Sequence, residues 1–145
     1  MFKFKFQKAL EYKEKLEDEA KERVRKKKEE EKLQIEKIEI MYTEKKDFLA
    51  EYEKKQHGKI DIAALTYCNN YLNIFEKTIK SEEKKLQELS LQVEKLQQDY
   101  FECVKERKIF EKLKEKDKEK YTAELEKEEQ KLVDEISNNL FNRRR

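Results

Sequence analysis

The second half of this chain carries an uninterrupted heptad pattern. Apolar residues there follow one another in alternating steps of three and four, and only Glu82 among them is charged. A pattern sustained over about four heptads is typical of a coiled-coil seam, the stripe that faces a partner helix. The seam positions are Leu72, Phe75, Ile79, Glu82, Leu86, Leu89, Val93, Leu96, Tyr100 and Cys103.

The first half of the chain has a weaker seam of the same kind. It steps through Ile35, Ile38, Tyr42, Lys45, Leu49 and Tyr52. Extended towards the N-terminus, it continues through Glu31, Lys28, Val24, Ala20, Glu17 and Leu10, and the charged stretch 25–32 crosses it. The sequence therefore predicts a long helix in the first half as well, with an apolar face less complete than that of the helix in the second half.

A single break separates the two seams, because the chain has no proline and its one glycine is Gly58. Glycine adopts the left-handed conformation that ends a helix, and Asp61 suits the cap of the next one. We expect a first helix over residues 3–56, a turn over 57–60, a second helix over 61–139 and a tail over 140–145, all in one coiled-coil domain.

The two seams come into register when the chain folds back at Gly58. Facing residues of an antiparallel pair have residue numbers with a constant sum, here about 120 for every pair. These pairs are Leu49–Leu72, Tyr42–Ile79, Ile35–Leu86, Val24–Leu96, Ala20–Tyr100 and Leu10–Phe110. The expected fold class is all-α, an antiparallel two-helix coiled-coil hairpin, in preference to one long helix that dimerises in parallel.

The second helix is expected to overhang, because the first is exhausted opposite residue 118 or so. Beyond it an apolar stripe continues through Tyr121, Leu125, Leu132, Val133, Ile136 and Leu140. An isolated helix with an uncovered stripe is marginal in water, and roughly 20 residues would extend ~30 Å. The overhang is interpreted as a partner site; a frayed end and self-association are the alternatives.

The composition excludes several classes of protein. Charged residues make up 48% of the chain and hydrophobic residues 36%, so a thick globular core is out of reach. The formal net charge is only +2, with both signs interspersed, which argues against a nucleic-acid binder. No apolar run is long enough to span a bilayer, the N-terminus is too polar for a signal peptide, and Cys68 and Cys103 are expected to be reduced thiols. A cytoplasmic protein is expected.

Catalytic motifs are absent from the sequence. One glycine excludes the phosphate-binding loops and the nucleophile elbow, which need several. The single histidine, His57, cannot supply a histidine-rich metal site or complete a triad alone. A hairpin also offers no pocket to tune a carboxylate as an acid. We expect no enzyme activity, no cofactor, no metal and no small-molecule substrate.

Aromatic residues gather near the expected turn: Phe48, Tyr52, Tyr67, Tyr71 and Phe75. They either thicken the end of the coil or form a docking patch, because exposed Tyr and Phe are favoured interface anchors. With Leu49 and Leu72 in the seam, Phe48 and Tyr71 are expected beside it. Arg143–Arg145 form either a solvated tail or a basic cluster that steers an acidic partner.

Three stretches resemble the FliJ family of the bacterial flagellar type III export apparatus. They are "FKFKFQKALEYKEKLEDEAK" at the start, "YLNIFEKTIK" in the middle and "ERKIFEKLKEKDKEKY…KEEQKLVDEI" near the end. The resemblance covers nearly the whole chain, and its most specific elements are Phe4 and Phe6 with Leu10, the run 111–116, and the pair Asp134–Glu135.

The resemblance implies a non-catalytic stalk similar to the γ subunit of rotary ATPases. Its partners would be the hexameric flagellar export ATPase, the membrane export-gate protein and export chaperones, at the cytoplasmic face of the membrane. The implied gate-facing patch is Met41, Phe48, Tyr52, Tyr71 and Phe75, although Lys45 and Glu82 bring charge close to it. The implied ATPase-facing end is Phe4, Phe6, Leu10, Tyr121, Leu125 and Leu132.

Two alternatives stay open at this point. One is a generic structural or chaperone-binding coiled-coil spacer that makes no contact with an ATPase. The other is the equivalent component of a virulence type III secretion system, which sequence patterns separate poorly from a flagellar protein.

Overall fold

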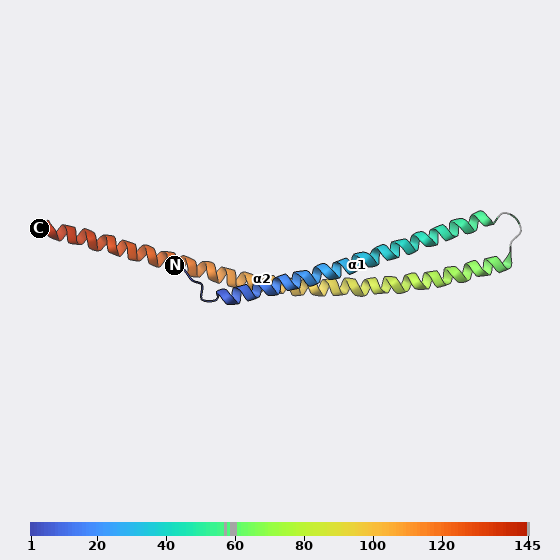
Figure 1. Ribbon diagram of the computed structural model, residues 1–145, viewed down its shortest axis with the longest axis horizontal. Coiled ribbons are helices and arrows are strands. Elements are labelled where there is room, and N and C mark those ends of the chain that lie inside the picture. Colours follow the sequence, from blue (N-terminus) through green and yellow to red (C-terminus); the bar gives the residue numbers. More distant parts are fainter. Residues whose placement is uncertain (57, 59–60, 145) are drawn as a thin grey trace. The chain divides into compact units, whose positions relative to one another are not determined.

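The chain forms two long helices, α1 (Gln7–Lys55) and α2 (Ile62–Arg143), in a computed structural model that describes residues 1–56, 58 and 61–144 (Figure 1). No strand occurs within those ranges. The all-α helical hairpin is therefore confirmed. Helix α1 begins at Gln7, later than the expected residue 3. Helix α2 continues through Arg143, so residues 140–143 of the expected tail are helical, and the prediction of a tail there is wrong.

The ends of the two helices follow from local chemistry. Gly58 has a φ of 120°, in the region that L side chains rarely adopt, so a glycine suits this position. Asp61 caps α2 as expected, because its carboxylate Oδ1 accepts a hydrogen bond from the backbone N–H of Ala63 at 3.0 Å. The remainder of the expected turn, residues 57, 59 and 60, lies outside the described residues.

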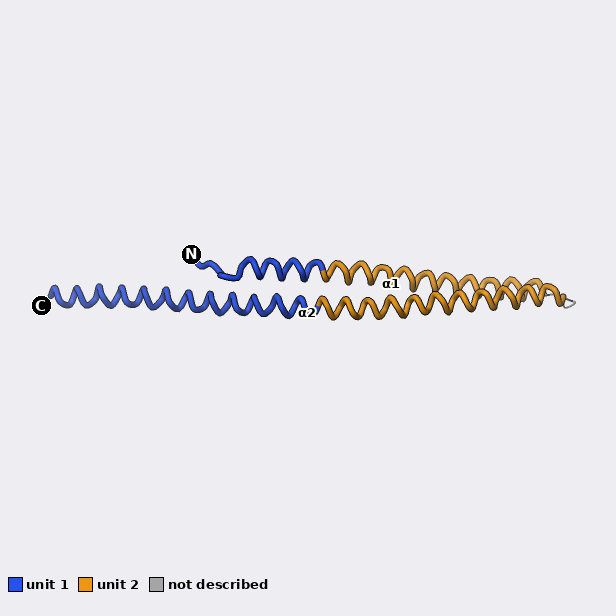
Figure 2. Tube along the Cα trace, turned by 90° about the horizontal axis from the view of Figure 1, so that it is seen from below, with its two compact units in different colours: residues 1–19, 101–145 blue, residues 20–100 orange. Residues whose placement is uncertain are grey.

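The chain divides into two compact units (Figure 2). Unit 1 contains residues 1–19 and 101–145, and unit 2 contains residues 20–100. In unit 2 the two helices are antiparallel, and the side-chain pairs that connect them include Gln34–Glu82, Lys37–Glu82 and Lys45–Glu76. Their residue numbers add to within about five of the predicted constant, so the predicted antiparallel fold-back is confirmed in this unit.

The α2 seam in unit 2 matches its prediction. Every predicted seam position from Leu72 to Tyr100 is buried or half-buried. The deepest apolar side chains of the unit are Ala20, Ile38, Cys68, Ile79 and Val93.

At every second position of the α1 seam in unit 2, the residue that faces α2 is the one before the predicted residue. Ile35, Tyr42 and Leu49 are 38%, 47% and 36% exposed, while the preceding residues Gln34, Met41 and Phe48 are half-buried. The same holds nearer the N-terminus, where the exposed residue is Lys28 and the half-buried one is Lys27. The predicted facing pairs of Ile35, Tyr42 and Leu49 are therefore wrong by one residue.

A buried carboxylate explains the shift at one of these positions, Gln34. Glu82 is 7% exposed, and the Gln34 amide Nε2 donates to its Oε2 at 2.6 Å and to its carbonyl at 3.0 Å. The ammonium groups of Lys37 and Lys85 approach its Oε1 to 3.4 and 3.3 Å. The hydrogen bond from Gln34, assisted by both lysines, lowers the pKa of Glu82. Glu82 needs a donor across the seam, so Gln34 faces it and the apolar Ile35 lies at the flank.

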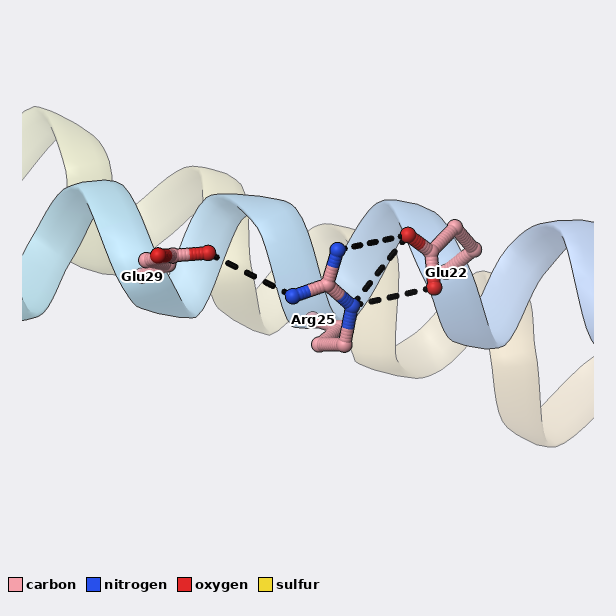
Figure 3. Close-up of polar contacts among 3 residues, drawn as sticks. All are labelled: Glu22, Arg25 and Glu29. Carbon is pink, nitrogen blue, oxygen red and sulfur yellow. Dashed lines mark hydrogen bonds and ion pairs between the residues drawn. The ribbon is translucent and has the colours of Figure 1, made fainter.

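The charged stretch of α1 is held by contacts within the helix. The Arg25 guanidinium lies between two carboxylates, donating to Glu22 at 2.7 and 3.0 Å and to Glu29 at 3.4 Å (Figure 3). The hydrogen bonds from Arg25 lower the pKa of Glu22. Such exposed pairs support a helix only weakly, and their spacing places them on its surface.

Unit 1 packs the first residues of the chain against α2. Lys13 binds Glu106 at 2.8 Å, and Arg107 binds both Glu17 across the pair and Glu111 on its own helix. The last half-buried residue of α2 is Tyr121, whose ring centroid lies 5.6 Å from that of Phe2. Residues 122–144 are all exposed, and Figure 2 shows this part of α2 continuing past the N-terminus. The expected overhang is present.

Candidate protein-interaction surfaces

The turn-end patch is the set Met41, Phe48, Tyr52, Tyr71 and Phe75 of unit 2. Its centre is a stack of three rings from both helices. The Phe48 and Tyr71 centroids are 4.2 Å apart, and those of Tyr71 and Phe75 are 5.7 Å apart. Because Phe48 and Phe75 are half-buried and Tyr71 is exposed, Tyr71 presents the stack to solvent.

A cleft of about 400 Å³ adjoins this stack. Phe48, Tyr52, Tyr67 and Cys68 are among the residues that line it. Burial raises the pKa of Tyr52, whose hydroxyl accepts a hydrogen bond from the Gln56 amide at 2.5 Å. The cleft therefore combines apolar side chains with a neutral hydroxyl, and Glu51, Lys55 and Asp61 add charge to its lining.

Met41 is separate from the ring stack. It is half-buried in the α1 seam, two helical turns before Phe48. Charged contacts lie beside it, since Lys45 pairs with Glu76 at 3.4 Å and the Tyr42 hydroxyl donates to the Glu83 carboxylate. That hydrogen bond raises the pKa of Tyr42. These charges limit the patch on the side away from the turn.

The predicted patch omits the most exposed apolar residues near the turn. Ile62, Tyr67 and Ile74 of α2 are more exposed than any residue of the turn-end patch. A signal for them was present in the sequence, because residues 62–75 contain no Asp, Glu, Lys or Arg in a chain that is 48% charged. A helix without charges on its solvent face is unusual and marks an interaction surface.

The predicted ATPase-facing end divides into buried and exposed residues, all in unit 1. Phe4 and Leu10 are buried, so they support the packing against α2 and present little contact area. Phe6 is exposed, with its ring centroid 5.9 Å from that of Phe4 and 5.6 Å from the Lys5 ammonium. Phe6 is therefore the accessible aromatic residue of this set.

Phe2 is a residue of this end that the prediction missed. Its contact with Tyr121 closes one side of a shallow groove lined also by Lys3, Asp117 and Glu124. The alternation of Phe2, Phe4 and Phe6 with lysines was the signal in the sequence. The groove thus combines two aromatic rings with charged side chains of both signs.

The C-terminal segment, residues 122–143 of α2, carries the remaining predicted residues. Leu125 and Leu132 are exposed, and so are the other apolar residues of their stripe, Val133, Ile136 and Leu140. Continued in steps of three and four from Tyr121, the heptad reaches Glu124, Glu128, Lys131 and Glu135. At 100° per residue, the mean direction of the stripe is therefore rotated by roughly 110° from that of the seam, so a longer α1 would not cover it.

The described residues contain no group of His, Cys, Asp and Glu side chains that could hold a metal ion. No helix among them has a stretch apolar enough to cross a membrane. The exposed apolar residues described above lie on two surfaces, one in each unit.

A comparison with protein families matches residues 2–145 to the family described as the flagellar FliJ protein. The match spans essentially the whole chain, including both surfaces described above. Comparisons with curated proteins and with solved structures give no match.

Proposed function

Because the chain belongs to the flagellar FliJ family and is thus a component of the flagellar type III export apparatus, we propose that it is the non-catalytic stalk of that apparatus. In this proposal it binds the hexameric export ATPase, promotes ATP hydrolysis and links the ring to the membrane export gate. It acts in the cytoplasm, at the cytoplasmic face of the membrane at the flagellar base. Export chaperones are a third class of partner.

The exposed apolar stripe of the C-terminal segment is the observation that carries the ATPase contact. Leu125 and Leu132 lie on a helix that extends beyond its own hairpin partner. A slender helix with apolar residues on one face is suited to a narrow opening such as the centre of a ring. Tyr121, directly before this segment, and the exposed Phe6 of unit 1 extend the contact in this proposal.

The turn-end patch supports the gate contact. Tyr71 and the cleft beside it offer aromatic surface on a helix that has no charge over residues 62–75. Apolar surface of this kind needs no conformational change to accept a partner's side chain.

The experiment compares two variants in two assays. Leu125→Glu/Leu132→Glu should lower stimulation of the cognate ATPase at least about fivefold, because a charge in the contact must be desolvated, and should leave gate binding unchanged. Tyr71→Ala should weaken binding to the soluble part of the gate about tenfold and leave ATPase stimulation unchanged. Circular dichroism checks that both variants stay helical.

Removal of residues 122–145 separates the stalk from a structural spacer. The shortened chain keeps every residue of α1 and α2 that the structure describes as buried or half-buried, and should remain folded. A stalk loses ATPase stimulation, whereas a spacer keeps its function. If the full chain neither stimulates the ATPase nor elutes with it, the proposal is wrong.

A further inference from the structure

The C-terminal segment has the length and pattern of a helix that pairs with another helix. Its 22 residues extend about 33 Å, or three heptads, which is close to the shortest length for a coiled coil. The stripe of Leu125, Leu132, Val133, Ile136 and Leu140 is exposed along that whole length. Because the stripe lies on a different face from the seam, the chain's own α1 does not cover it.

Charge along this segment is distributed unevenly. Over residues 119–135, acidic side chains outnumber lysines by more than two to one. Arg143 and Arg144, both exposed, follow at the other end. One end of the segment is thus negative and the other positive, and a second copy turned end for end presents the complementary pattern.

We propose that the C-terminal segments of two copies of this chain pair in an antiparallel dimer in the absence of other partners. With the two-fold axis between Leu132 and Val133, Leu125 of one copy lies opposite Leu140 of the other. Arg143 then lies opposite Thr122, between Glu119 and Glu126. The pairing covers the stripe and places each arginine cluster on the acidic end of its neighbour.

The opposite orientation lacks this complementarity. In a parallel pair the arginines of both copies lie side by side, and so do the acidic residues, which costs stability. The antiparallel pair has one internal defect, because Glu129 falls opposite Ile136 in the stripe. A charge at that position weakens the contact, so the dimer is a weak one that a tighter partner displaces.

The test is sedimentation equilibrium of the full chain between about 5 and 500 µM at low salt, since a weak dimer depends on concentration. The wild type should pass from monomer to dimer within this range. Leu132→Ser/Leu140→Ser should remain monomeric throughout, and Glu129→Leu should lower the dissociation constant about tenfold. These positions contact no part of α1, so circular dichroism should show an intact hairpin in each variant.

Charge reversal determines the orientation. Arg143→Glu/Arg144→Glu should raise the dissociation constant about fivefold in the antiparallel pair, whereas in a parallel pair it would not. A wild type that stays monomeric up to the highest concentration overturns the proposal. So does a dimer that Leu132→Ser/Leu140→Ser leaves intact. The measurement uses no ATPase, and its result is independent of the function proposed above.

Discussion

Helix α2 can be compared with itself on either side of Tyr121. Before that residue, its heptad positions from Leu72 onward are buried or half-buried, while residues 122–144 are all exposed. Both stretches are rich in Glu and Lys and both carry apolar residues at helical spacing. Amphipathic pattern therefore predicts a helix in both, but only the first stretch gains stability from packing, since an isolated helix is marginal in water.

The largest difference is expected between two isoleucines of α2. Ile79→Ala removes a buried side chain from unit 2 and should lower the free energy of unfolding by about 2–4 kcal/mol. Ile136→Ala, the matched control, changes an exposed side chain and should cost less than about 0.5 kcal/mol. Urea denaturation of dilute protein measures both. Equal losses would mean that the C-terminal segment is packed against another part of the chain.

A second pair of variants tests the corrected α1 seam within unit 2. Phe48→Ala should cost about 2 kcal/mol, because it removes a half-buried ring that stacks on Tyr71. Leu49→Ala, one residue later on the flank, should cost less than about 1 kcal/mol. Urea midpoints of the two variants decide the register. A larger loss for Leu49→Ala would restore the original seam.

The two seams differ in how well the sequence predicted them. The α2 seam was predictable because apolar residues fill it except at Glu82, so hydrophobicity alone identifies the face. The α1 seam was not, because polar Lys27 and Gln34 lie in it while apolar Ile35 lies outside. The hydrophobicity of single residues does not reveal that the buried Glu82 needs a hydrogen-bond donor on the facing helix. Only the pairing of Gln34 with Glu82 decides the register there.

The candidate surfaces were predictable to a similar extent. The aromatic residues near the turn were identified, and three of them form one stack. Burial was harder to predict, since Phe4 and Leu10 support unit 1 while Tyr67 and Ile74 face solvent. The rotation of the C-terminal stripe away from the seam follows from counting heptad steps in the sequence, whereas the exposure of residues 122–144 is known only from the structure.

The next largest effect is expected from acid, which should lower the stability that Glu82 contributes to the unit 2 seam. The pKa of Glu82 is lowered in the folded chain, so its contribution to stability is present above the usual glutamate pKa and is lost as the pH falls through the lowered value. Glu82→Gln should therefore show a melting temperature that falls about 2–3 °C less than the wild type's between pH 7 and pH 3. The exposed Glu88→Gln is the matched control and should follow the wild type. An identical acid response in Glu82→Gln would show that this carboxylate is solvated.

The smallest effect is expected at the surface pair of Glu22 and Arg25. Their hydrogen bonds at 2.7 and 3.0 Å are almost as short as those of Gln34 to Glu82, yet both side chains are exposed, so water replaces each contact at little cost. Arg25→Gln should shift the melting temperature by less than about 1 °C, and added salt should reduce even that difference. Gln34→Leu, which removes an interhelical donor from the buried Glu82, should shift it several times further. Thermal unfolding of both variants at two salt concentrations makes the comparison. Equal shifts would mean that burial across the seam adds no stability to a hydrogen bond. The need of Glu82 for a donor would then not explain why Gln34 faces it.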